Sequence, residues 1–249
     1  MSELLYYDLK GASGVAPGLA TQICREIGRR IVAGSPSAGE LISDETTFAE
    51  RFGVSKSVIR EAIKLLVGKG LVEVKRGSGT RVRDRSNWML FDDDVLAWHQ
   101  SAKPSPDFLR QLMDIRLVIE PKAASWAASV GTPDSHAAIE AAQLRMEQEK
   151  RAVEDFVMAD AFFHRAILHA ANNEFLRSME GVIFSALLTS IRLTNDDPRK
   201  NEDSIPFHRE VCDAILARDA ALAEQKMSTL LTDAHQRMTR AVSDYGNTD

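Results

Sequence analysis

The sequence is poor in the residues and segments that mark secreted, disulfide-bonded or membrane proteins. Its 249 residues include only two cysteines, Cys24 and Cys212, which suggest neither a disulfide framework nor a cysteine-based zinc site. No apolar run approaches the ~20 residues that are needed to span a bilayer. The beginning of the chain, MSELLYYDLK, lacks the basic and then apolar pattern of a signal peptide. We therefore expect a cytoplasmic protein that has no membrane partner.

The chain also lacks the overall positive charge of many nucleic-acid-binding proteins, since its net charge is −5. That average conceals a division along the sequence. Residues 1–83 carry 13 basic and 9 acidic residues, a net charge of +4, whereas residues 84–249 carry 18 basic and 27 acidic residues, a net charge of −9. A basic first third and an acidic remainder predict two domains with different partners.

The first domain is predicted to span residues 18–83, after a flexible and aperiodic arm over residues 1–17. Apolar spacing and helix-capping residues predict three helices, followed by two β-prone segments around Gly77-Ser78-Gly79. The helices are expected at 19–32, at 46–52 with Asp44 as cap, and at 56–69 with Ser55 as cap, and the strands at 71–74 and 80–83. Three helices and a hairpin form the pattern of a winged helix-turn-helix.

The third predicted helix and the hairpin carry the residues expected to contact DNA. Lys56, Ser57 and Arg60 lie in the first turns of that helix, where side chains of a recognition helix reach the major groove. The hairpin between the strands is basic and rich in glycine, so that its backbone could lie close to a sugar-phosphate wall. The alternative is a solvated basic helix face with an ordinary glycine turn.

The remainder of the chain is predicted to be a connector followed by an all-helical domain. The connector, 84–106, includes a short helix over 95–100 that is capped by the solvated run Asp92-Asp93-Asp94. The domain 107–243 shows no β-like alternation and can bury its own core as a helical bundle. Its helices are expected at 107–130, 134–151, 153–171, 173–194, 202–217 and 219–243.

Within the helical domain, one aspartate and two histidines could hold a metal ion. Asp160 and His164 are four residues apart on one helix face, and His208 lies near the start of another helix. One carboxylate and two imidazoles suit Zn²⁺, Mn²⁺, Ni²⁺ or Fe²⁺. The alternative is an ordinary Asp–His helix pair with a surface histidine. Arg116 could clamp a carboxylate through two hydrogen bonds, or could be a surface residue that pairs with a nearby acidic side chain.

The stretch FAERFGVSKSVIREAIKLLVGKGLVEVKRGSGTRV resembles the DNA-binding domain of the GntR family of bacterial transcription regulators. The resemblance implies operator contacts from the recognition helix and the wing, by Lys56, Ser57, Val58, Arg60, Arg76, Gly77 and Ser78. One position departs from the family pattern, because Thr46 stands where many members carry an arginine. That departure leaves the operator sequence open.

The motifs DAFFHRAI and HREVCDAILARD resemble the ligand-sensing FCD domain of the FadR subfamily. The resemblance implies that Asp160, His164 and His208 bind a divalent metal, and that Arg116 faces a carboxylate effector. Ser204, Arg192 and Asn173 are further candidates for the pocket lining. The last family histidine is replaced by Leu230, and His235 lies roughly 140° away around its helix, so only three protein ligands are expected.

The connector RSNWMLFDDDVLAW is similar to that of D-galactonate operon repressors, which implies a sugar acid as effector. The resulting prediction is a homodimeric transcription regulator that represses a sugar-acid operon and is released from its operator by the effector. The alternatives are a regulator of the same family that senses an amino acid, another organic acid or a fatty acyl group without metal, and a metal-dependent hydrolase. The hydrolase lacks support, since no nucleophile–base pair or paired acid–base carboxylates accompany the three ligands.

Overall fold

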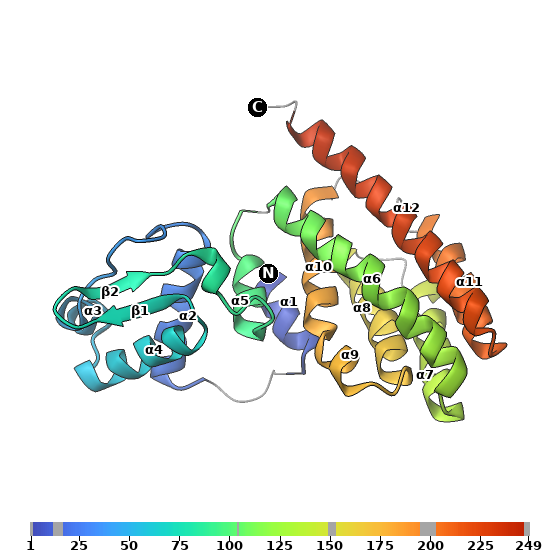
Figure 1. Cartoon of the computed structure of the whole chain (residues 1–249), viewed down its shortest axis with the longest axis horizontal. Helices are drawn as coiled ribbons and strands as arrows, with labels where there is room; N and C mark the ends of the chain where they lie inside the picture. The colour runs from blue at the N-terminus through green and yellow to red at the C-terminus, as the bar shows by residue number, and fades with distance from the viewer. Residues whose placement is uncertain (1, 12–16, 104, 149–152, 195–202, 247–249) are drawn as a thin grey trace. The chain divides into compact units, whose positions relative to one another are not determined.

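A computed structural model describes residues 2–11, 17–103, 105–148, 153–194 and 203–246 (Figure 1). The chain divides into two compact units, Met1–Lys103 and Pro104–Asp249. The predicted fold class is confirmed: the first unit combines helices with a two-stranded hairpin, and the described part of the second unit is entirely helical. Across the described residues, no helix is both long and apolar enough to cross a membrane.

The first unit contains the three helices and the hairpin of a winged helix-turn-helix. Its elements are α2 (Leu19–Val32), α3 (Glu45–Phe52), α4 (Lys56–Gly68), β1 (Val72–Lys75) and β2 (Gly79–Val82). The strands are antiparallel, with Val72 opposite Val82 and Lys75 opposite Gly79. The apolar faces of the helices and the first residue of β1 enclose one core.

Local chemistry sets where α3 and α4 begin and end. The carboxylate of Asp44 accepts hydrogen bonds from the backbone N–H groups of Thr46 and Thr47, which caps α3 as the sequence predicts. Gly53 ends α3 in the left-handed conformation, with φ +64°, which a glycine adopts without a Cβ clash. Ser55 is the residue before α4, but its hydroxyl contacts Ser57 rather than a backbone amide. These turns direct the first residues of α4 towards solvent.

The beginning of the chain differs from the predicted flexible arm, because Ser2–Leu9 form helix α1. Eight residues are too few to form a stable helix alone in water. Tertiary contacts supply the stability: Tyr6 and Leu9 are fully buried, and Glu3 pairs with Arg29 of α2. The sequence pattern missed α1 because these contacts come from distant residues.

The predicted connector also differs, because much of it packs onto the first unit. It contains a 3₁₀ turn, Arg85–Asn87, and helix α5 (Asp93–His99), whose Val95 and Trp98 join the core. Asp92 caps α5 as predicted. The aspartate run is not simply solvated, however. Lys69, at the end of α4, pairs with Asp92 and Asp94, and Tyr6 of α1 donates a hydrogen bond to Asp93.

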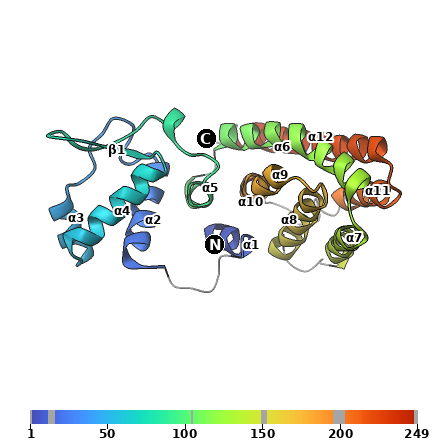
Figure 2. The same cartoon turned by 60° about the horizontal axis from the view of Figure 1, so that its bottom comes forward.

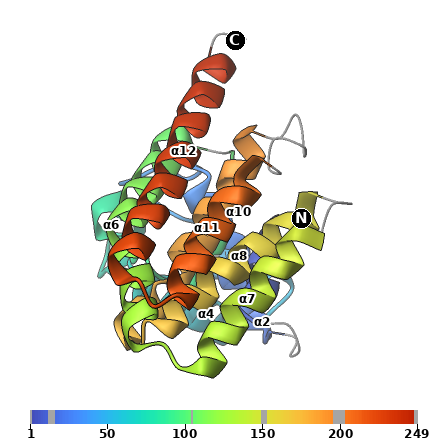
Figure 3. The ribbon, with the colours of Figure 1, turned by 90° about the vertical axis from the view of Figure 1, so that its right-hand side faces the viewer.

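The second unit is a helical bundle in which long helices lie side by side. Its elements are α6 (Pro106–Val130), α7 (Pro133–Gln148), α8 (Val153–Ala170), α9 (Glu174–Ser178), α10 (Glu180–Thr194), α11 (Ile205–Leu216) and α12 (Ala220–Gly246). Figures 2 and 3 show α12 lying along α6, with α11 beside it. The helix predicted over 173–194 is divided into α9 and α10 at Met179. The ends predicted at 151 and 202 lie outside the described residues.

Candidate functional site

The first turns of α4 present three of the four DNA-contacting residues predicted on this helix to solvent. Lys56, Ser57 and Arg60 are exposed, because the opposite face of the helix carries the buried Ile59, Ala62, Ile63 and Leu66. Val58 differs, since it is half-buried and packs against the core. Two cations and a hydroxyl near a helix N-terminus make a surface suited to phosphate and base contacts.

Arg60 already has a partner within the first unit. Its Nε lies 2.8 Å from Oε2 of Glu45 at the start of α3, and 61% of the arginine side chain is exposed. An exposed ion pair contributes at most about 1 kcal/mol. Arg60 can therefore exchange Glu45 for a phosphate or a base edge at little cost.

The wing residues Arg76, Gly77 and Ser78 form the exposed three-residue loop between β1 and β2. Gly77 has φ +78°, and the N–H of Ser78 donates to the carbonyl of Lys75, which closes the turn. A residue with a Cβ would be strained at Gly77, and nothing but open space lies where that Cβ would point. The glycine is thus required by the turn, and the loop projects Arg76 without covering it.

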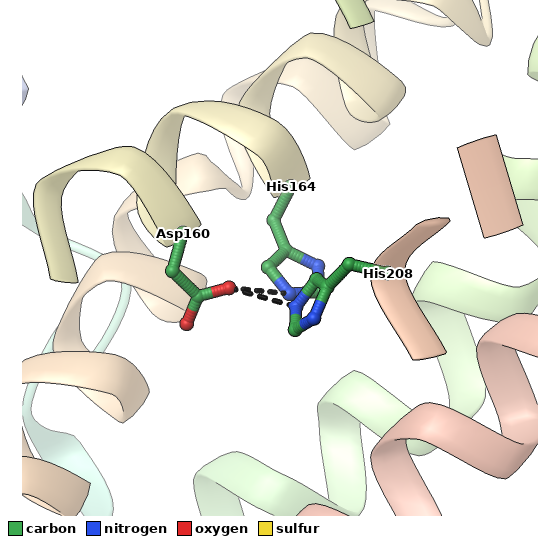
Figure 4. A group of neighbouring side chains, drawn as sticks. All are labelled: Asp160, His164 and His208. Atoms are coloured by element: carbon green, nitrogen blue, oxygen red, sulfur yellow. Dashed lines mark hydrogen bonds and ion pairs between the residues drawn. The ribbon is translucent and has the colours of Figure 1, made fainter. Parts of the chain in front are cut away.

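In the second unit, Asp160, His164 and His208 converge as the sequence predicts (Figure 4). Asp160 and His164 extend from α8, and His208 extends from α11. Oδ1 of Asp160 lies 2.9 Å from Nε2 of His208 and 3.3 Å from Nε2 of His164. The candidate ligand atoms of all three lie within 4.8 Å of one another. We call these three residues the Asp–His–His cluster.

The other ring nitrogen of each histidine lies beside an oxygen atom. Nδ1 of His208 lies 2.8 Å from the backbone carbonyl of Ser204, and Nδ1 of His164 contacts Oε2 of Glu120. With Nδ1 turned to these oxygens, each Nε2 faces Asp160, and it can bind a metal once it gives up the proton that it donates to that carboxylate. Metal-binding histidines in proteins are fixed in this way by a carbonyl or carboxylate behind the ring. The donor set therefore fits a divalent cation.

Arg116 is buried beside the cluster rather than exposed at the surface. It extends from α6 and is only 3% exposed; its Nε pairs with Oε1 of Glu120, and its Nη2 lies 3.2 Å from Nε2 of His164. Its partner Glu120 joins the candidate site, although the sequence pattern offered it only as one of the acidic side chains near Arg116. Its position four residues after Arg116 was the available signal, since i and i+4 share a helix face.

The mutual pairing controls the ionisation of these buried groups. Burial alone would raise the pKa of Glu120, but the charges of Arg116 and His164 outweigh burial and lower it to about 2. Burial likewise opposes the ionised form of Asp160, and hydrogen bonds from His164 and His208 hold its pKa below the ordinary value. Against the effect of burial, Glu120 and Asp160 raise the pKa of His164 to about 9. Both carboxylates are therefore anionic at neutral pH.

The remaining predicted site residues have different placements. Ser204 is buried and provides the carbonyl behind His208. Asn173 caps α9, where its side-chain oxygen accepts from the amides of Phe175 and Leu176, so its side chain serves the helix and gives no support to an effector role. Leu230 is 2% exposed on α12, as an apolar core residue. Arg192 belongs to α10, but its side chain lies outside the described part of the structure.

Comparisons with known proteins identify both units. Residues 19–82 match the family "Bacterial regulatory proteins, gntR family", and residues 111–233 match the FCD domain. Among curated proteins, the galactonate operon transcriptional repressor of Escherichia coli K12 is 30% identical over 214 residues, which cover 85% of this chain and 93% of that protein. The HTH-type transcriptional regulator YieP of the same strain is 29% identical over 216 residues, 86% of this chain and 92% of that protein.

Solved structures agree on the fold. A structure entitled "Lar controls the expression of the Listeria monocytogenes agr system and mediates virulence" covers 91% of this chain and 99% of its own, with a TM-score of 0.63 and 19% identity. The matched families and relatives are transcription regulators rather than enzymes. The chain therefore belongs to the GntR family of bacterial transcription regulators and joins a GntR DNA-binding domain to an FCD domain.

Proposed function

We propose that the protein is a homodimeric repressor of a sugar-acid catabolic operon. In this proposal two copies of the winged domain bind adjacent half-sites of a two-fold symmetric operator. Lys56, Ser57 and Arg60 contact the major groove, with a partial contribution from Val58, and Arg76, Gly77 and Ser78 contact the neighbouring groove. The exposure of the α4 N-terminus and of the wing loop supports these roles. The 30% identity to a galactonate operon repressor supports the choice of effector class.

The single observation that carries the sensing part of the proposal is the buried Arg116 beside the Asp–His–His cluster. A buried guanidinium is a good partner for a small carboxylate, since it can donate two parallel hydrogen bonds. Asp160, His164 and His208 would hold a divalent metal, which when bound would supply a Lewis-acidic position for effector oxygens. Because Leu230 offers no ligand, we expect oxygen atoms from water or from the effector to complete the coordination.

Effector binding then acts on DNA through a shift of population. The effector must bind more tightly to the arrangement of the dimer that cannot hold the operator, because a ligand with equal affinity for both arrangements shifts nothing. Arg116 and the Asp–His–His cluster hold the effector, whereas α4 and the wing hold the operator. The two activities therefore reside in different units and can be separated by mutation.

The test is a thermal-shift and operator-release titration of the full chain with D-galactonate and other aldonates, with and without Zn²⁺. We expect stabilisation that needs both components, and release of the operator at the same concentrations. Stabilisation by the acid in excess chelator would favour the metal-free alternative. No response to any aldonate would refute the sugar-acid assignment.

A second experiment tests the clamp. Arg116→Ala should leave operator binding intact and abolish release by the effector. Normal release in this variant would refute the role of Arg116. A parallel test of Arg110→Ala, an exposed arginine on the same helix that pairs with Asp107 and Asp114, is the matched control and should respond normally.

A further inference from the structure

Glu120 lies between Arg116 and His164 in the candidate sensing site. It extends from α6 and is 1% exposed, and its carboxylate contacts a different partner with each oxygen. Oε1 pairs with Nε of Arg116, and Oε2 contacts Nδ1 of His164. One buried carboxylate therefore touches both the candidate effector-binding arginine and a candidate metal ligand.

We propose that Glu120 is a positioning residue that couples the metal and the effector, an inference that rests on the proposed function. Through its contact with Nδ1 of His164, it directs Nε2 of that ring towards Asp160 and His208. By accepting from Nε of Arg116, it fixes the guanidinium, whose Nη groups can exchange their present contacts, with Sδ of Met113 and Nε2 of His164, for a carboxylate. Glu120 itself contacts neither the metal nor the effector.

The contact between Arg116 and His164 explains why the coupling should be favourable. Nη2 of Arg116 lies 3.2 Å from Nε2 of His164, the nitrogen that would bind the metal. Once this nitrogen has given up its proton, the guanidinium can donate to its lone pair and so competes with the metal for it. An effector carboxylate gives Nη2 another acceptor, so that Nη2 no longer donates to the imidazole of His164. Each ligand should increase the affinity for the other by the same factor, as linkage requires.

Two acceptor atoms are essential to this role. A carboxylate offers two acceptor oxygens, whereas the amide of glutamine offers one acceptor and one donor group. In Glu120→Gln the NH₂ group would face either Arg116 or His164, and both already present donors there. The side-chain size is almost unchanged, so the variant removes one acceptor with little change in packing.

The test is calorimetric titration of the full chain with Zn²⁺, in the presence and absence of D-galactonate. Glu120→Gln should weaken Zn²⁺ binding by about 10- to 100-fold, the usual loss when a residue behind a metal ligand is changed. The factor by which D-galactonate strengthens Zn²⁺ binding should fall towards one. Glu147→Gln is the matched control, because Glu147 pairs with Arg209 in the same unit and contacts no histidine in the described residues. It should retain wild-type affinity and coupling.

A measurement on the unmodified protein does not depend on the variant folding. In the Zn²⁺-loaded chain, ¹⁵N NMR should show His164 protonated at Nδ1 and bound to metal through Nε2. Binding through Nδ1 would overturn the inference, as would unchanged affinity and coupling in a folded Glu120→Gln variant. Failure of the unmodified chain to bind Zn²⁺ would instead overturn the metal part of the proposed function, and this inference with it.

Discussion

The packing of α5 on α2 can be tested at one glycine. Gly28 lies in the middle of α2 and faces the indole of Trp98, which is fully buried. A Cβ at position 28 would lie 2.2 Å from Cζ3, 2.5 Å from Cε3 and 2.6 Å from Cη2 of Trp98. These distances are far below van der Waals contact, so Gly28→Ala forces α2 and α5 apart.

Two opposing effects set the change in stability that Gly28→Ala should cause. Alanine is better than glycine inside a helix by about 1 kcal/mol. Overpacking of a well-filled core costs about 1–3 kcal/mol, and a clash with a rigid indole belongs at the upper end of that range. We therefore expect Gly28→Ala to destabilise the first unit by about 2 kcal/mol. In a Trp98→Leu background the clash is absent, and the same change should stabilise the unit by about 1 kcal/mol.

The assay is hydrogen exchange of the α2 and α5 amides in the full chain, read by mass spectrometry, which reports the free energy of opening of this unit alone. The double-mutant cycle should give a coupling of about 3 kcal/mol between positions 28 and 98. The reasoning is refuted if Gly28→Ala has the same effect in both backgrounds. Peptides from α7, in the other unit, provide the internal control.

Three further predictions concern the DNA surface, the metal ligands and pH. Arg60→Ala should weaken operator binding by about 10-fold or more and lower the salt dependence measured by fluorescence anisotropy, while Zn²⁺ affinity is unchanged; loss of both would contradict the separation of the two activities. Asp160→Asn should abolish tight Zn²⁺ binding in calorimetry but leave operator affinity intact, since the amide lacks the negative charge that joins both histidines; retained Zn²⁺ affinity would exclude the cluster as the site. Burial lowers the pKa of His99 to about 4, whereas an unfolded histidine titrates near 6.5. The unfolded state therefore takes up the proton first, and stability of the first unit should decline by up to about 3 kcal/mol as pH falls from 6.5 to 4. Exchange of α5 amides at several pH values measures that decline; His99→Gln should remove this component, and an equal decline in the variant would disprove it.

Local patterns were sufficient for much of the fold. Apolar spacing predicted α2 and α4, and the carboxylate of Asp44 predicted the beginning of α3. These signals work because they depend on interactions within a few residues of the chain. The same holds for the pair Asp160 and His164, whose i, i+4 spacing places both on one face of α8.

Segments whose conformation depends on distant partners were not predictable in this way. Helix α1 is too short to persist alone and forms where Tyr6 reaches Asp93 and Glu3 reaches Arg29. The hydroxyl group that donates to Asp93 lies 87 positions away in sequence. No local pattern contains that information, so residues 2–9 resembled an arm and 93–99 resembled part of a connector.

The sequence by itself determined that this chain has a winged domain and a helical domain, and which aspartate and histidines could meet. Only the tertiary structure decided that Arg116 is buried, that Glu120 links it to His164, and that Val58 packs partly into the core. The physical reason is that helix periodicity assigns a residue to a face, whereas the packing of other helices decides whether that face is covered. A charge that is buried away from water needs partners in fixed positions. The buried Arg116–Glu120 pair on α6 therefore holds a fixed geometry beside His164, which the same pair on an exposed helix face would not.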